Sequence, residues 1–81
     1  MHELAITKQV IQDIMDVVKE KKIEKVKRVV VEVGKLTTYK VEPIKYYFNQ
    51  LRKEHPQLKK TIFEGRNVAG EETILKEIEV K

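Results

Sequence analysis

The stretch that decides the fold is "KVKRVVVEVGKL", residues 25–36. Valines fill four of the five positions from 29 to 33, and such a β-branched run is the strongest strand signal in the chain. Val29, Val31 and Val33 share one face of the predicted strand. Because Val30 makes the opposite face apolar as well, we expect a central or helix-covered strand. Gly34 is expected to end the strand or to mark a bulge.

Residues 3–22, before this strand, have the pattern of an amphipathic helix. Their apolar residues recur at the helical period of 3.6, and lysines gather in the last turn, where they suit the negative end of the helix dipole. The apolar stripe consists of Leu4, Val10, Ile11, Ile14, Val17 and Val18.

A second helix is predicted after the strand. Its apolar face combines Ile44, Tyr47, Phe48 and Leu51. Pro43 is tolerated only in a first helical turn, so the helix should begin near Val41 or Glu42. Pro56 should end it and push His55 out of the helical conformation.

Two further strands are predicted, "KKTIFEG" (59–65) and "ETILKEIEVK" (72–81), separated by the turn "GRNVAG" (65–70). We expect Ile74, Ile78 and Val80 on one face of the last strand. The two strands can pair as a hairpin across the turn.

The element order is therefore α-β-α-β-β. It predicts one α+β domain over residues 1–81, with two helices on one face of a three-stranded mixed or antiparallel sheet. The connection through the second helix is long enough for a right-handed crossover. The predicted core consists of Ile11, Ile14, Val29, Val31, Val33, Phe48 and Ile78.

Composition excludes several classes of protein. The chain has no cysteine, which rules out disulfides, thiol nucleophiles, iron–sulfur clusters and cysteine-ligated zinc. No apolar run approaches the ~20 residues of a membrane span, so we expect a cytoplasmic protein without membrane contact. The high proportion of Lys and Glu among the charged residues is typical of proteins from heat-adapted organisms.

Catalysis and nucleic-acid binding are both poorly supported by the residues present. There is no serine, no glycine-rich phosphate loop and only two histidines, His2 and His55, so we expect no enzyme and no catalytic residue. The net charge is only +4. The most basic run, "KEKKIEKVKR" (19–28), is interleaved with acids and lacks stacking aromatics, so we interpret it as a solvated surface.

The N-terminal "MHEL" is the candidate metal site. Ni(II) and Cu(II) favour tetragonal nitrogen ligation. The Met1 α-amine, the His2 backbone nitrogen and the His2 imidazole can chelate one ion, and the Glu3 backbone nitrogen, the Glu3 carboxylate or water can complete the plane. The alternative is that His2 belongs to a frayed terminus with no role, because position alone is a weak signal.

The sequence resembles the HypA family, whose members are nickel-insertion accessory proteins of NiFe hydrogenase maturation. The resemblance rests on the order of four segments, "MHEL", "KVKRVVVEVGKL", "PIKYYFNQL" and "ETILKEIEVK". Gly34 and Leu36 match the family's Gly-x-Leu turn. The resemblance implies nickel ligands at Met1, His2 and Glu3. It also implies a HypB-like GTPase and a hydrogenase large-subunit precursor as partners.

The sequence departs from the family pattern at two places. Family members carry a zinc domain with two Cys-x-x-Cys pairs between the last two strands, where this chain has only the turn 65–70. The chain therefore looks like the nickel-binding domain alone, without zinc. Lys40 also stands where the family usually has an aspartate near the nickel, and a protonated lysine opposes a bound cation.

Two alternatives to a nickel protein remain open at this stage. The first is an interaction module of the same fold that has lost nickel binding and forms a homodimer through an exposed sheet edge. The second is a basic nucleic-acid binder, which rests only on the net charge. Titration with Ni(II) and a salt-dependent shift assay separate the three functions.

Overall fold

The computed structural model describes residues 2–81, with side chains from Glu3 onward. Helix α1 (His2–Lys21) leads into the central strand β1 (Val26–Gly34), and helix α2 (Val41–Leu51) follows. Two short 3-10 turns, η1 (Arg52–Glu54) and η2 (Pro56–Leu58), precede the strands β2 (Ile62–Val68) and β3 (Thr73–Val80). The predicted order of helices and strands is confirmed.

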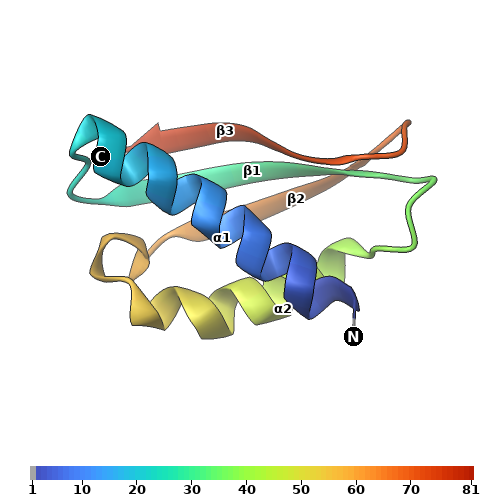
Figure 1. Cartoon of the computed structure of the whole chain (residues 1–81), viewed down its shortest axis with the longest axis horizontal. Helices are drawn as coiled ribbons and strands as arrows, with labels where there is room; N and C mark the ends of the chain where they lie inside the picture. Colours follow the sequence, from blue (N-terminus) through green and yellow to red (C-terminus); the bar gives the residue numbers. More distant parts are fainter. Residues whose placement is uncertain (1) are drawn as a thin grey trace.

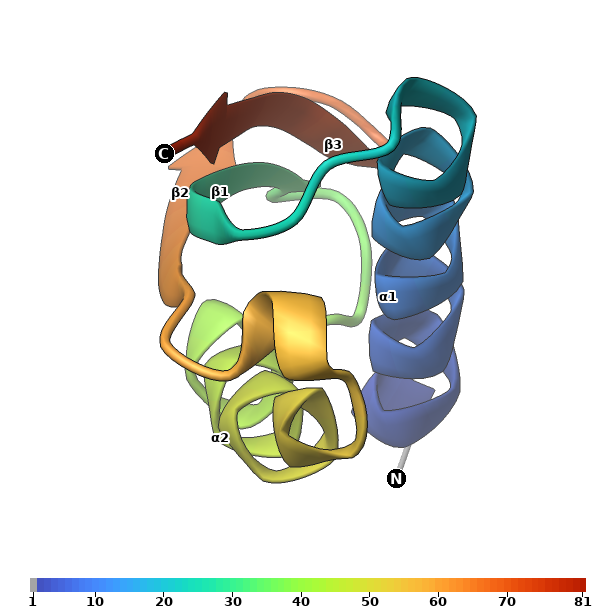
Figure 2. The same ribbon diagram turned by 90° about the vertical axis from the view of Figure 1, so that its left-hand side faces the viewer.

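The sheet has the order β2-β1-β3, with β1 parallel to β2 and antiparallel to β3. Both helices lie on one side of this mixed sheet, as predicted (Figures 1 and 2). The central position of β1 agrees with its apolar character on both faces. The parallel pairing of β1 with β2 also fits the predicted crossover through α2.

The predicted hairpin between the last two strands is wrong, because β1 lies between them. β2 also runs on to Val68, so most of the predicted turn is strand. The connection from β2 to β3 crosses the end of β1 and is fixed there by backbone hydrogen bonds. Gly34 N–H donates to the Glu72 carbonyl at 2.9 Å, and Lys35 N–H donates to the Val68 carbonyl at 2.8 Å. These non-local bonds replace the local pairing of a hairpin.

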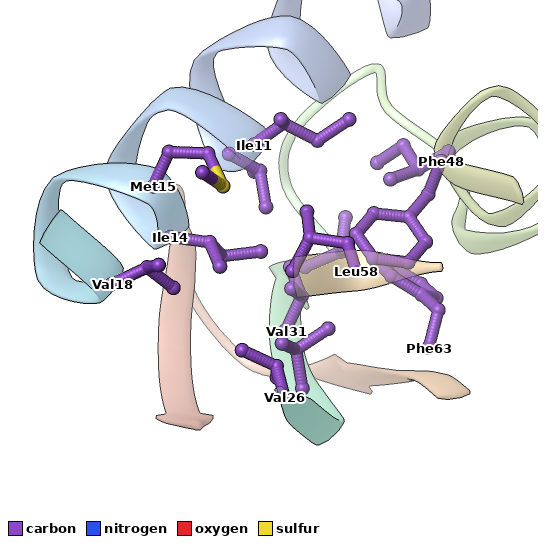
Figure 3. Close-up of a cluster of buried hydrophobic side chains, with 13 residues drawn as sticks. Ile11, Ile14, Met15, Val18, Val26, Val31, Phe48, Leu58 and Phe63 are labelled. Atoms are coloured by element: carbon purple, nitrogen blue, oxygen red, sulfur yellow. The ribbon is translucent and has the colours of Figure 1, made fainter. Parts of the chain in front are cut away.

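Side chains from both helices and the sheet interdigitate in one core (Figure 3). Predicted core residues on both helices and β1 are buried, and Met15, Leu58 and Phe63 join them. The Phe48 and Phe63 rings lie with their centroids 5.1 Å apart in a tilted arrangement. The confirmed predictions are Ile11, Ile14, Val29, Val31, Val33 and Phe48.

Ile78 is the core prediction that is wrong, since it is only half-buried at the edge of the core. The pairing of β1 with β3 shifts between Val30 and Val31, whose partners are Glu77 and Leu75. One extra residue in β3 breaks the strict alternation of faces. As a result Leu75 and Ile78 both pack against the core, whereas Ile74 and Val80, predicted to share the face of Ile78, are exposed.

The outer face of the sheet, which no helix covers, carries a cluster of charges. The Arg28 guanidinium pairs with the Glu64 carboxylate, and it also bonds Glu79 at 3.0 Å. Arg66 pairs with Glu64 at 2.6 Å. Val30 lies on this face and is nevertheless only 1% exposed. The aliphatic stems of neighbouring charged residues can shield such a valine while their heads stay in water.

Candidate metal centre

The first turn of α1 holds the predicted nickel ligands. Met1 and the His2 side chain lie outside the described residues, and the backbone of His2 begins the helix. Glu3 is half-buried in the first helical turn, where a carboxylate suits the positive end of the helix dipole. Of the three predicted ligand residues, the structure therefore describes Glu3 in full and His2 by its backbone alone.

The Glu3 carboxylate is tied to the segment before α2. Lys40 N–H donates a hydrogen bond to Glu3 Oε2 at 3.3 Å across 37 positions of sequence. Lys40 is the N-cap of α2, with extended backbone angles of φ −119° and ψ 145°, and its side chain makes no capping bond. The loop before α2 thus reaches the start of α1 through its backbone.

Short-range hydrogen bonds shape the loop that carries Lys40. The Thr37 hydroxyl donates to the Gly34 carbonyl at 2.8 Å, and it accepts a bond from Tyr39 N–H at 3.2 Å. Tyr39 also packs against the core. These contacts fix the path from the end of β1 to Lys40. They explain how the Gly-x-Leu turn positions Lys40 beside the start of α1. Leu36, the last residue of that turn motif, is itself 75% exposed.

Hydrogen bonding lowers the pKa of Glu3 below its usual value. The main cause is the bond from its own backbone N–H, and the N–H of Lys40 adds to it, while burial acts in the opposite direction. Glu3 is therefore ionised at neutral pH and can act as an oxygen ligand. The backbone donor of Lys40 was not predictable from sequence, because a main-chain N–H leaves no mark in the residue pattern.

His55, the second histidine, is not brought to this site. It lies between η1 and η2 with an extended backbone, φ −124° and ψ 111°, as predicted from Pro56. Figure 1 shows that turn at the opposite end of the molecule from the start of α1. Among the residues that the structure describes, no three His, Cys, Asp or Glu side chains cluster as a metal site.

A family model described as "Hydrogenase/urease nickel incorporation, metallochaperone, hypA" matches residues 1–73. The chain belongs to the HypA family. A curated relative, the hydrogenase maturation factor HypA of Caldanaerobacter subterraneus subsp. tengcongensis, is 35% identical over 51 residues. That match covers 63% of this chain but only 45% of the relative, so the chain spans less than half of that HypA protein.

The fold also matches a solved HypA structure. The solution structure of the Ni metallochaperone HypA from Helicobacter pylori superimposes with a TM-score of 0.81, covering 96% of both chains. The sequence identity is 15%, so this likeness concerns the HypA fold alone. Neither helix within residues 2–81 is long and apolar enough to cross a membrane.

Proposed function

We propose that this HypA-family chain binds Ni(II) through Met1, His2 and Glu3 and delivers it during NiFe hydrogenase maturation in the cytoplasm. The family match over residues 1–73, which includes the N-terminal triplet, carries the proposal. The family description names both hydrogenase and urease, and the curated relative is a hydrogenase maturation factor. The chain would act as a metal carrier rather than as an enzyme.

The ligand chemistry follows from the atoms of the N-terminal triplet. The Met1 amine, the His2 backbone nitrogen and the His2 imidazole would supply nitrogen donors, which suit tetragonal Ni(II). Glu3 would add a carboxylate that the Lys40 N–H holds in place at 3.3 Å. With no cysteine in the chain, a cysteine-ligated zinc site is excluded here, and we propose that no zinc is bound.

Isothermal calorimetry with Ni(II) tests the metal site. We expect one equivalent per chain, loss of binding in His2→Ala, and no change in the control His55→Ala. One extra residue before Met1 should also abolish the site, because the amine becomes an amide. Binding should weaken as the pH falls below about 6.5, where the imidazole is protonated. Equal affinity of the wild type, His2→Ala and the extended chain would refute the proposal.

The partners we propose are a HypB-like GTPase and a hydrogenase large-subunit precursor. Their support is membership of the HypA family and the name of the curated relative. Titrating each purified partner with the chain, with and without Ni(II), tests them. Association with neither protein would contradict this part of the proposal.

The second candidate function is a protein-interaction module that no longer carries nickel. Lys40 favours it, because its backbone N–H bonds the Glu3 carboxylate and a protonated lysine at that position would oppose a bound cation. In this case the calorimetric titration would show no Ni(II) binding to the wild type, while binding to a protein partner would persist.

A further inference from the structure

Lysines from separate parts of the chain meet around one pocket. The pocket, of about 190 Å³, is lined by residues 25–27 at the start of β1, by residues of the segment 56–60, and by Lys81 after β3. In Figure 1 these segments lie together at the end of the molecule opposite the start of α1. We refer to it as the lysine pocket.

The backbone around the lysine pocket is held in place by buried contacts. The Thr61 hydroxyl donates to the Val26 carbonyl at 2.7 Å, and both residues are buried. The Arg52 guanidinium donates to the carbonyls of Leu58 and Lys59. Leu58 is fully buried in the core. The positions of the two walls relative to each other are therefore fixed, and only the lysine side chains remain free to adapt.

The net charge of the protein is concentrated at this end. Residues 19–27 and 56–60 together contain seven lysines and two glutamates, a net charge of +5, whereas the whole chain carries +4. The rest of the chain is thus nearly neutral. A groove lined by Lys19 and Lys22 adjoins the pocket and shares Lys25 and Pro56 with it. Glu24 also lines this groove, so the basic surface extends from the pocket to the last turn of α1 with one acidic residue in it.

Most of the pocket lysines are available for a ligand. Lys25, Lys59 and Lys60 are exposed, and within residues 2–81 none of them forms an ion pair. Lys27 contacts Glu79 at 3.6 Å, but Arg28 also engages that carboxylate, at 3.0 Å. Uncompensated like charges held at one end of a small domain favour an anionic partner.

We propose that the lysine pocket docks an acidic segment of a partner protein, which inserts one apolar side chain into the pocket. Pro56, which is exposed, offers that side chain an apolar contact, while carboxylates of the segment face Lys25, Lys59 and Lys60. A nucleic acid or nucleotide is less well matched, because neither an aromatic residue for base stacking nor an arginine lines the pocket. This docking does not depend on nickel, since Figure 1 shows the pocket segments at the end of the molecule opposite the start of α1, where Glu3 lies.

Fluorescence anisotropy with a labelled Glu- and Asp-rich peptide containing one central leucine tests the proposal. In low salt we expect saturable binding that weakens as salt rises. Reversing Lys25, Lys59 and Lys60 to Glu should weaken binding about tenfold or more. The triple Lys→Gln variant should give a smaller loss, and it preserves the test if the charge reversal impairs folding. Replacing the leucine of the peptide by serine should also weaken binding.

The matched control reverses Lys8, Lys45 and Lys76 to Glu, which changes the net charge equally at exposed positions away from the pocket. An equal loss of binding in this control would overturn the proposal, because the attraction would then depend on net charge alone. Tighter binding of single-stranded DNA or RNA than of the acidic peptide would overturn it as well. Circular dichroism on every variant confirms that each is folded.

Discussion

Glu3 and Lys40 connect the first turn of α1 to the N-cap of α2 through a 3.3 Å hydrogen bond from the Lys40 N–H to the Glu3 carboxylate. The bond brings the loop after β1 to the proposed nickel ligands. It also places the Lys40 position, where the family pattern has an aspartate, within reach of the start of α1. The identity of residue 40 should therefore affect the metal site through charge.

Replacing Lys40 by Asp should tighten Ni(II) binding by roughly three- to tenfold, because an opposing charge is exchanged for an attracting one. The hydrogen bond to Glu3 comes from the backbone and should survive the substitution. Calorimetry measures the change. Lys45→Asp, an equal charge change at an exposed position of α2, is the control. Indistinguishable affinities of Lys40→Asp and the wild type would show that the loop does not influence the metal.

Phe48→Ala should reduce the free energy of unfolding by about 3–5 kcal/mol, because it leaves a cavity in the core. Phe48 is fully buried against Phe63. In a domain whose total stability is of the order of 5–15 kcal/mol, this loss can prevent folding. Urea denaturation measures it. Tyr46→Ala, on the same helix but 60% exposed, should cost much less; equal losses would contradict the assigned inner face of α2.

Gly34→Ala should destabilise the protein by roughly 1–3 kcal/mol through overpacking. A Cβ atom at Gly34 would lie 2.6 Å from the carbonyl carbon of Gly70, in a connection that crosses the end of β1. Because the contacted atoms belong to the Gly70 backbone and cannot rotate away as a side chain does, the connection between β2 and β3 must shift. Thermal unfolding compared with the exposed neighbour Lys35→Ala checks this. A melting temperature equal to that of the wild type would show that the crossing is loose.

Glu64→Gln should weaken the acid dependence of stability. Hydrogen bonding from Arg66, and to a lesser extent the charges of Arg66 and Arg28, lower the pKa of Glu64 from its usual 4.5. A lowered pKa in the folded state means that this stabilisation is complete above pH 4.5 and is lost as the pH falls below it, through the pKa of the folded state.

The measurement is urea denaturation of the wild type and Glu64→Gln at a series of pH values. The two stability curves should converge at low pH and separate above pH 4.5, where only the wild type has the charged pairs. Glu71→Gln, an exposed glutamate of the β2–β3 connection, is the matched control. A constant difference between Glu64→Gln and the wild type across all pH values would refute the role of ionisation.

The protein should have a weak tendency to form homodimers. With the order β2-β1-β3, both β2 and β3 are edge strands within the sheet. Unpaired edge groups can pair with a second copy, but charges on β3 such as Glu77 and Glu79 oppose close approach, whereas Lys27 lies in the central strand β1. Analytical ultracentrifugation over a range of concentrations measures the association. Monomer alone at the highest concentration would contradict this prediction.

Local patterns in the sequence determined which elements form. The valine run indicated β1 as a central strand, helical periodicity indicated α1 and α2, and Pro43 marked the first turn of α2. Pro56 does not end α2 as predicted, because the helix ends at Leu51 and passes into η1 before His55. Burial of Ile14, Val31 and Phe48 followed from the same patterns. The N-terminal triplet and the order of these segments also identified the HypA family, which the match over residues 1–73 confirmed.

Only the tertiary structure decided how distant segments meet. The β2-β1-β3 order, the shift near Leu75 that turned Ile74 outward, and the bond between Glu3 and Lys40 all depend on backbone groups far apart in sequence. Every residue carries the same N–H and C=O groups, so such pairings leave no local signature. The lysine pocket likewise exists only because the crossover through α2 returns the chain to the start of β1.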